Sequence, residues 1–317
     1  FHTPKHPKTW IYNLYMKNIL VISYSQSGQL TEIVEKFSKP LQGNIDFVNY
    51  TSKKSFSFPW RSHEFFNTMP ETVLEVDYEV EDIHYNCEKY DLIVLGYQPW
   101  FLSPSLPTTA LLKNEKFKSL LKDTPVVTVI GSRNMWLNSQ ESVKKLIQEA
   151  GGKLVGNVPF IDKTNNLLSA VTILHWMLTG KKEKKWGVFP LPGVNQEDID
   201  QAGKFGQLLN EDLTNNTLEN FQKRILLTGE VNINTSILFI EGRAKKLFLI
   251  WANAIVKKGT TEAKRRRWVK FFTYYLFIAL FMVAPIVLTF YSILIRPFSS
   301  KGIKEKKTYF CGVELKK

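Results

Sequence analysis

The chain contains very little cysteine. Its 317 residues include two cysteines, Cys87 and Cys311, which lie far apart in the sequence. This pair fits none of the Cys and His spacings that hold structural zinc or iron–sulfur clusters, so we expect no bound metal. Such a low cysteine content is typical of proteins in a reducing compartment.

Two common signatures of nucleotide-binding loops are also missing. The polar segment after the first apolar run, residues 25–28, contains neither lysine nor arginine. A Walker-type phosphate loop requires a lysine there, and a dinucleotide-binding loop requires several glycines. The sequence therefore excludes both kinds of site at this position.

The main body of the chain has no excess of positive charge. The formal net charge is +13, but residues 257–317 carry 14 of the 42 lysines and arginines with only three acidic residues. Residues 16–256 contain equal numbers of bases and acids. Because nucleic-acid-binding domains carry a basic patch on their folded body, no nucleic-acid partner is expected.

One stretch near the start of the chain has the pattern of a strand, a polar loop and a helix in succession, and we expect the rest of the chain to be organised around it. Asn18–Ser23 is a short apolar run typical of a buried strand, and apolar residues from Leu30 to Phe37 repeat at helical spacing. The loop between them reads Ser25, Gln26, Ser27, Gly28, Gln29. Backbone N–H groups at a helix N-terminus bind anions, and the serine hydroxyls add donors. We expect Ser25–Leu30 to hold a monophosphate; an ordinary turn without ligand is the alternative.

Four further apolar runs predict strands that alternate with helices. The strands are expected at Ile45–Tyr50, Tyr90–Gly96, Pro125–Gly131 and Lys153–Ile161, and the helices at Ser105–Leu121, from a cap at Asn138 or Ser139 to Ala150, at Asn165–Thr179 and at Gln196–Leu213. The loop Tyr24–Thr31 resembles the phosphate loop of flavodoxins, in which FMN is bound. The predicted fold is therefore α/β: a flavodoxin-like doubly wound five-stranded parallel sheet, order 2-1-3-4-5, over residues 16–213.

Two more loops follow successive strands with chemistry that suits a flat ring system. The first contains Gln98, Pro99, Trp100 and Phe101, and the second contains Gly131, Ser132, Arg133, Asn134, Met135 and Trp136. Ligands of doubly wound sheets bind beyond the carboxyl ends of the strands. Together with Ser25–Leu30, these loops predict FMN as the cofactor.

The segment 51–89 is too long for a plain connection between a strand and a helix. It is rich in aromatic residues, and Thr68 with Pro70 is typical of a helix start. We interpret it either as a lid or wall for a substrate, or as a packed helical region with core aromatic residues. The helix predicted at Asn165–Thr179 contains His175, which we interpret as a core residue.

The C-terminal tail is basic and apolar. Residues 214–270 are expected to form an amphipathic basic helical segment, and 271–295 is a run without charge that is long enough to cross a hydrocarbon layer of about 30 Å. Residues 296–317 form a basic tail, and 1–15 an upstream extension. Seven basic residues before the run against five after it place the main body in the cytoplasm. A hairpin at Pro285, with both flanks on one side, is the alternative.

Three segments together resemble a family of flavodoxin-like proteins: Tyr24–Leu30, His63–Leu74 and Gly131–Trp136. The family is that of the dialkylresorcinol condensing enzymes or aromatases of bacterial aryl-polyene and flexirubin-type pigment pathways. The resemblance implies a membrane-associated FMN enzyme that oxidises a 2,5-dialkylcyclohexane-1,3-dione to a dialkylresorcinol. Together with the apolar run and the basic residues that flank it, the resemblance predicts a location at the cytoplasmic face of the bacterial inner membrane, anchored by the C-terminal hydrophobic helix.

The residues offer three candidates for catalysis: His63 as an acid or base, Tyr97, and Arg133 as the partner of an oxyanion. The partners expected are a small hydrophobic cyclic diketone or quinone and membrane lipid, and self-association into a homodimer stays open. An NAD(P)H:quinone reductase of the same fold is the first alternative function. A membrane-anchored electron-transfer module without enzymatic activity is the second.

Overall fold

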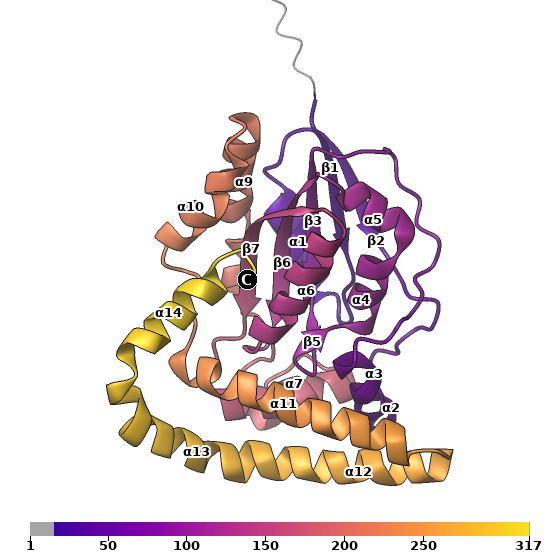
Figure 1. Cartoon of the computed structure of the whole chain (residues 1–317), viewed down its shortest axis with the longest axis vertical. Coiled ribbons are helices and arrows are strands. Elements are labelled where there is room, and N and C mark those ends of the chain that lie inside the picture. Colours follow the sequence, from indigo (N-terminus) through magenta and orange to yellow (C-terminus); the bar gives the residue numbers. More distant parts are fainter. Residues whose placement is uncertain (1–15, 317) are drawn as a thin grey trace, which may run out of the picture.

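The computed structural model describes residues 16–316, so the predicted extension at 1–15 lies outside the described residues. At the centre is a five-stranded parallel sheet in the order β2-β1-β3-β6-β7 (Figure 1). The strands are β1 (Asn18–Ser23), β2 (Asn44–Asn49), β3 (Leu92–Tyr97), β6 (Pro125–Ser132) and β7 (Lys153–Ile161). Counted along the chain they stand in the order 2-1-3-4-5, which confirms the predicted flavodoxin-like fold.

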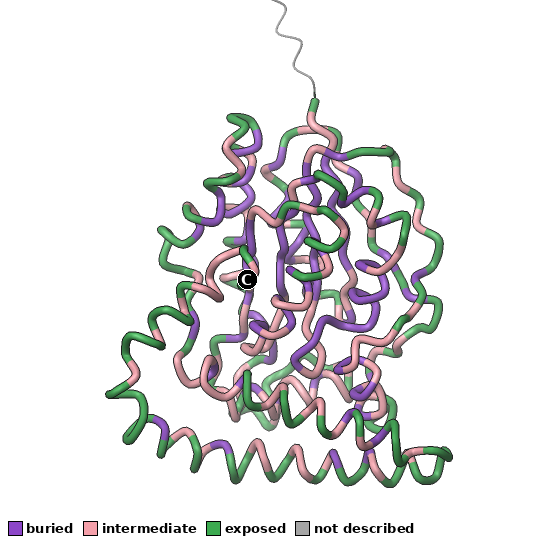
Figure 2. The backbone as a smooth tube through the Cα atoms, in the orientation of Figure 1, coloured by how far each residue is buried: buried purple, intermediate pink, exposed green. Residues whose placement is uncertain are grey.

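Helices cover both faces of the sheet, because the strands are apolar on both sides. On one face lie α1 (Gln29–Ser38), α8 (Gln196–Asp200), α9 (Gly203–Thr214) and α10 (Phe221–Leu227), and on the other α4 (Leu106–Lys113), α5 (Glu115–Leu121) and α6 (Leu137–Glu149). Phe37 and Phe117 are fully buried on opposite faces. The buried residues therefore follow the sheet and the inner sides of these helices (Figure 2).

Three predicted helix boundaries are wrong for local reasons. Ser105–Leu121 is broken at Asn114, whose backbone is extended and whose side chain caps α5 by accepting from the Phe117 N–H at 3.1 Å. Gln196–Leu213 is likewise two helices, α8 and α9. The N-cap of α6 is Trp136 rather than Asn138 or Ser139, and it makes no side-chain cap hydrogen bond.

The folded body extends beyond the predicted limit at residue 213. Helix α10 packs on β7, and Phe221 is fully buried against Gly156. A Cβ at Gly156 would lie 2.4 Å from Cδ1 of Phe221, so the strand needs glycine there. The first part of the expected amphipathic segment 214–270 is thus part of the hydrophobic core.

The long segment 51–89 contributes two short helices, α2 (Ser62–Asn67) and α3 (Met69–Val73). Thr68 is the N-cap of α3 with Pro70 in its first turn, as the sequence predicts. Phe66, Met69 and Val73 pack in a hydrophobic cluster with Ala252, Ile255, Val269 and Phe272 of the C-terminal helices. The segment therefore supports the tail of the chain.

The tail consists of α11 (Thr235–Lys258), a long helix and α14 (Ser300–Cys311). The long helix runs over the 37 residues Glu262–Phe298 and includes α12 (Glu262–Ile278) and α13 (Ala284–Phe290); its most apolar stretch of 18 residues has a mean hydropathy of 2.5. The helix continues through Pro285. The turn before this proline, Ala279–Val283, is π-helical, and such a local widening of the helix is found where a proline removes a backbone hydrogen bond. The alternative of a hairpin at Pro285 is therefore wrong, because the helix does not turn there, although both flanks of the helix do lie on one body (Figure 1).

Candidate active site

The three loops singled out in the sequence follow β1, β3 and β6, which are neighbours in the sheet. Parallel strands end at one edge, so the loops meet there, at the lower end of the sheet in Figure 1. Gln26 and Gln98 connect the first two loops. With its side-chain amide turned so that the oxygen faces the donors, Gln98 accepts from the Gln26 backbone N–H at 3.1 Å and from Nε1 of Trp100 at 3.3 Å. Leu30 packs against Gly131 and connects the first loop to the third.

The first loop leaves the start of α1 open. Gly28 is the N-cap of α1 with a φ of 83°, a conformation that favours glycine, and no side chain caps the helix at this position. Ser25 Oγ accepts from the Leu30 N–H at 3.2 Å, which leaves the hydroxyl proton of Ser25 free to donate. A Cβ at Gly28 would meet no atom within 4 Å. The loop therefore offers backbone and hydroxyl donors to an open space.

The second loop is held by aromatic packing. It forms a short hairpin of β4 (Pro99–Trp100) and β5 (Ser103–Pro104). The Trp100 ring meets Phe56 and Trp60 edge to face, with centroids 5.1 and 5.3 Å apart. Gln26 donates to the backbone oxygens of Phe56 and Ser57, so the segment 51–60 joins this cluster. The aromatic residues thus form a rigid wall beside the first loop.

The third loop contains three polar side chains, those of Ser132, Arg133 and Asn134. Trp136 is buried beneath it. Asn134 donates to the side chain of Asn166 at 2.9 Å, while its own buried Oδ1 has no hydrogen-bond partner among the described residues. Arg133 donates to the backbone oxygen of Asn166 at 3.2 Å, and Ser132 lies beside it. A buried acceptor without a partner is costly, so Asn134 marks a place where a ligand N–H fits.

An apolar cavity of about 900 Å³ opens beside these loops. Its walls come from the second and third loops, from α7 (Asn166–Thr179), from α11 and from the long helix. The loop residues in its lining are Pro99, Phe101, Leu102, Ser132, Arg133 and Met135. A cavity of this size and character accommodates a hydrophobic molecule of drug-like dimensions.

Few polar side chains reach the cavity. Arg133 is half-buried there; burial lowers its pKa to about 10, against the opposing effect of the carboxylates of Asp162 and Glu241. His175 also lines the cavity, contrary to its interpretation as a core residue. Its buried Nε2 makes no hydrogen bond within the described chain and lies 3.5 Å from Glu183. The guanidinium of Arg133 and the imidazole of His175 therefore both line a cavity whose walls are mostly apolar.

The other two catalytic candidates lie elsewhere. His63 is exposed on α2 and is absent from the cavity lining. Tyr97 is fully buried and donates to Gln140 at 2.6 Å, and burial raises its pKa well above 10. A neutral, engaged phenol of this kind positions Gln140 and α6. Of the three candidates, the structure brings only Arg133 to the cavity.

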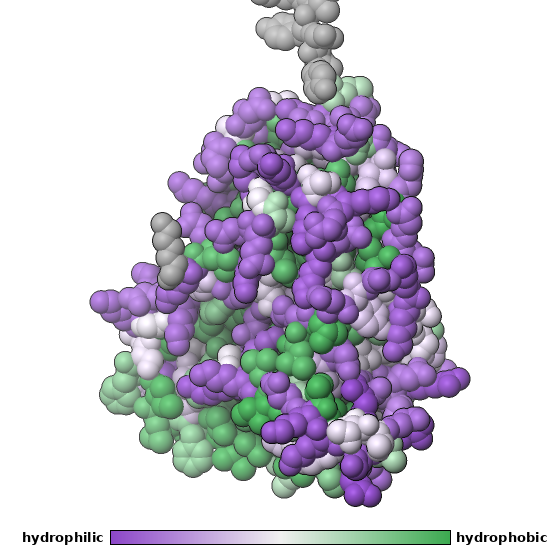
Figure 3. Space-filling view, turned by 45° about the vertical axis from the view of Figure 1, so that its right-hand side comes forward, coloured by the Kyte–Doolittle hydropathy of each residue, from purple (hydrophilic) through white to green (hydrophobic). Residues whose placement is uncertain are grey.

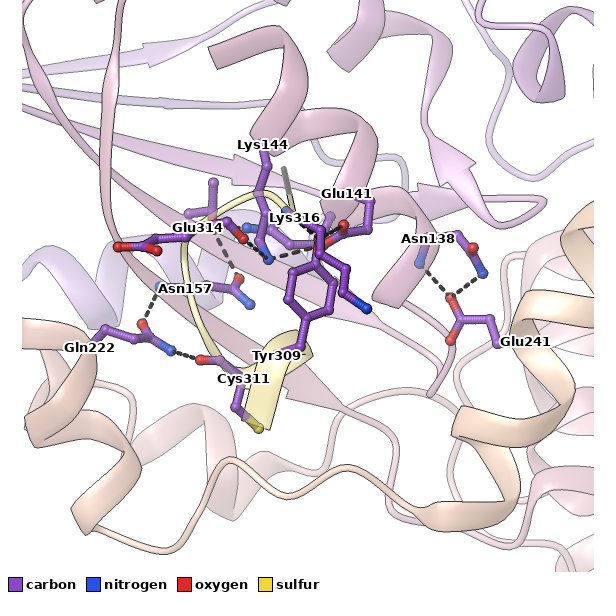
Figure 4. A network of polar contacts seen from close by, with 12 residues as sticks. Asn138, Glu141, Lys144, Asn157, Gln222, Glu241, Tyr309, Cys311, Glu314 and Lys316 are labelled. Carbon is purple, nitrogen blue, oxygen red and sulfur yellow. Dashed lines mark hydrogen bonds and ion pairs between the residues drawn. The ribbon is translucent and has the colours of Figure 1, made fainter. Parts of the chain in front are cut away.

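Sequence reasoning missed a buried carboxyl group next to the third loop. Glu241 of α11 is 0% exposed, and its Oε1 accepts from the backbone N–H and the side chain of Asn138 at 2.8 and 3.1 Å (Figure 4). Its Oε2 has no partner in the described chain. Burial raises the pKa of Glu241 from 4.5 to about 7. The residue joins α11 to the N-terminus of α6, and no local pattern distinguishes it from a surface glutamate.

Glu241 makes the stability of the protein depend on pH. Because its pKa is higher in the folded chain than in the unfolded chain, its contribution is fully present below pH 4.5 and is lost as the pH rises towards about 7. We expect Glu241→Gln, which keeps an acceptor for Asn138, to be more stable than the wild type at pH 8 by about 3 kcal/mol, and to differ little at pH 4.5. Urea unfolding of both proteins at pH 8 and at pH 4.5 measures their free energies of unfolding. An equal difference between variant and wild type at the two pH values would contradict this effect of Glu241.

No protein-family model and no curated protein matches the chain. Solved structures do match. A flavoprotein of Lactobacillus acidophilus NCFM in complex with FMN is 18% identical over 45% of this chain and 93% of its own, with a TM-score of 0.35. A putative flavoprotein of Bacteroides eggerthii DSM 20697 is 18% identical over 47% and 91%, with a TM-score of 0.37. Oxidised flavodoxin 1 of Bacillus cereus is 14% identical over 62% and 97%, with a TM-score of 0.31.

Similarity at this level carries no argument about activity. The fold is established by the strand order of the chain itself, which defines a flavodoxin-like α/β protein with a long apolar C-terminal helix. Within residues 16–316, no group of three or more His, Cys, Asp and Glu side chains is arranged to hold a metal ion.

Proposed function

We propose that the chain is an FMN-dependent oxidoreductase that acts on a hydrophobic cyclic substrate at a membrane. The observation that carries this proposal is the apolar cavity, which reaches Phe101, Arg133 and Met135 at the strand ends where the start of α1 also lies. A ligand site for a phosphate and a site for an oily molecule thus share one edge of the sheet.

The residues present fit FMN. The first-turn N–H groups of α1 and the hydroxyls of Ser25 and Ser27 suit its phosphate, since Gly28 leaves the space above them open. The Gln98–Phe101 wall and the Gly131–Trp136 loop flank the place expected for the ring, where the unpaired Oδ1 of Asn134 would accept a ring N–H. FMN, when bound, supplies the acceptance of a hydride.

The proposed reaction is the oxidation of a 2,5-dialkylcyclohexane-1,3-dione to a dialkylresorcinol. The substrate loses one hydride and one proton, and enolisation completes the aromatic ring. Arg133 would hold the developing enolate oxygen, because a charge-assisted hydrogen bond in an apolar site strengthens as negative charge forms. His175, which lines the same cavity, would take the proton. The cavity walls would hold the alkyl chains and exclude water.

Replacement of Arg133 tests its role. Arg133→Met is expected to lower kcat/KM for the diketone by about tenfold, the effect of losing one charge-assisted hydrogen bond. Arg243→Met is the matched control, because Arg243 also lines the cavity but stacks on Phe239, 3.7 Å from the ring centroid. That control should retain kcat/KM within about twofold. Equal losses of kcat/KM in both variants would show that Arg133 has no specific role in the reaction.

Anaerobic reduction of the flavin distinguishes the functions. The FMN-loaded protein in mild detergent is mixed with the cyclic diketone, and the expected result is loss of the yellow flavin absorbance together with formation of the dialkylresorcinol. Bleaching by NAD(P)H with no effect of the diketone would instead support the quinone reductase. A flavin that neither reagent reduces would support an electron-transfer module.

A further inference from the structure

The long helix Glu262–Phe298 lies across the lower end of the body beside α11 (Figure 1). Its inner side contacts the body through Val269, Phe272, Ala284 and Tyr291, which are at most 8% exposed. Its outer side carries large apolar side chains that are 55–65% exposed: Tyr274, Met282, Ile286, Phe290, Ile293 and Leu294. Figure 3 shows hydrophobic residues gathered at this end of the molecule. Such a surface is too apolar to face water alone.

The N-terminal end of this helix is fastened to the body. The guanidinium of Arg265 donates to the side chain and backbone oxygens of Asn67 at 2.7 and 2.9 Å, and to Glu71 at 2.7 Å. Asn67 and Glu71 belong to the segment of α2 and α3. Arg265 is therefore a fixed contact between the start of the long helix and the folded body.

The C-terminal end is fastened as well, through α14 (Figure 4). The Gln222 side chain donates to the backbone oxygen of Cys311 at 2.7 Å, and Tyr309 donates to Glu141. Lys144, whose Nζ lies 2.9 Å from the Glu141 carboxylate and 5.0 Å from the centroid of the Tyr309 ring, also donates to the backbone oxygen of Glu314. The chain that follows the apolar helix thus binds α6 and α10.

These contacts are incompatible with a helix that crosses a bilayer. At about 1.5 Å per residue, residues 271–295 span about 36 Å, enough to move the following residues to the other side of the membrane. Instead, the residues on both flanks of the run bind the same body. The basic side chains agree: exposed lysines and arginines occur at both ends of the helix, at 257–270 and 301–307, and both groups can meet anionic headgroups of one leaflet.

We propose that the helix Glu262–Phe298 lies flat in one leaflet of a lipid bilayer, with its outer face in the acyl chains and both chain flanks on the same side. The occupant of this surface is the membrane lipid. Because residues 275–281, 283 and 284 of the same helix form a wall of the cavity, a molecule dissolved in the leaflet can reach Arg133 without entering water. This last consequence rests on the proposed function; the orientation of the helix does not.

Cysteine scanning with nitroxide labels tests the orientation. In a Cys87→Ser and Cys311→Ser background, single cysteines replace the outer residues Met282, Ile286, Phe290 and Ile293, and the protein is reconstituted in phosphatidylethanolamine and phosphatidylglycerol vesicles. A flat helix predicts one shallow depth for all four labels. Val269→Cys, on the inner side and outside the cavity lining, is the matched control and should stay unreactive towards a lipophilic maleimide. Depths that differ across the four positions, with Val269→Cys as reactive as the others, would overturn the proposal.

The side on which the tail lies gives a second measurement. A protease-sensitive tag after Lys317 should be cut in sealed inside-out membrane vesicles, on the side of the main body, whereas a crossing helix protects it there. Protein that does not float with the vesicles at all would also contradict the proposal. Neither experiment uses FMN or substrate, so a flat helix in a protein that shows no flavin reduction would leave this inference standing and remove the proposed function.

Discussion

Ser27→Asp is expected to weaken FMN binding by at least about 100-fold while leaving the apoprotein as stable as the wild type or slightly more stable. A carboxylate beside the first turn of α1 interacts favourably with the helix N-terminus, by about 0.3–1 kcal/mol. The same carboxylate repels a phosphate dianion, and two like charges about 4 Å apart near a protein surface cost about 4 kcal/mol. The substitution therefore changes stability and affinity in opposite directions.

Riboflavin is the internal control for this experiment, because it has the flavin ring without the phosphate. Ser27→Asp should leave riboflavin affinity within about threefold of the wild type, and the neutral variant Ser27→Asn should retain FMN binding. Flavin fluorescence titration measures all three. If FMN binds the aspartate variant as tightly as it binds the wild type, the phosphate does not lie at this loop.

Gly206→Ala is expected to destabilise the protein by about 3 kcal/mol or more, or to prevent folding. Gly206 is buried in α9, and a Cβ there would lie 1.8 Å from the backbone oxygen of Phe37 in α1. A backbone atom cannot move aside as a side chain does, so α9 has to leave α1. The close approach of α9 to α1 therefore holds together the helices that cover one face of the sheet.

Gly242→Ala is the matched control, because Gly242 is also within a helix but a Cβ there would meet no atom within 4 Å. It should stabilise α11 by about 0.5–1 kcal/mol, the usual gain when alanine replaces glycine inside a helix. Urea unfolding in mild detergent gives both values. Equal small effects in the two variants would show that α9 does not pack on α1 as described.

The strands could be predicted well because their signal is local. Asn18–Ser23 and Lys153–Ile161 match β1 and β7 residue for residue, since short apolar runs bounded by polar turns have one consistent interpretation in a parallel sheet. The helical pattern predicted helix ends less well, because a polar residue can lie either inside a helix or at its N-cap. Asn114 fits a continuous helix in the sequence, yet its side chain caps a new one.

The tail could be predicted in composition but not in position. The apolar run at 271–295 is evident from hydropathy, and it belongs to a helix of 37 residues. Its return to the body depends on single contacts between distant residues, such as Gln222 with Cys311 and Arg265 with Glu71. Contacts of this kind leave no periodicity in the sequence.

In the candidate site, too, one part could be predicted from the sequence and another could not. The loops at Ser25–Leu30, Gln98–Phe101 and Gly131–Trp136 could be singled out, because loops after neighbouring parallel strands must meet. The cavity could not, because its other walls come from α7, α11 and the long helix. For the same reason His63 was a plausible candidate in the sequence and lies exposed, whereas His175 was interpreted as core and lines the cavity.

The most direct test of the FMN site is the visible spectrum of the full chain purified in mild detergent, followed by identification of the chromophore that it releases. We expect flavin absorption bands and release of FMN in a one-to-one ratio with protein, or the same spectrum after titration of the purified chain with FMN. A colourless protein that FMN does not colour on titration would contradict it.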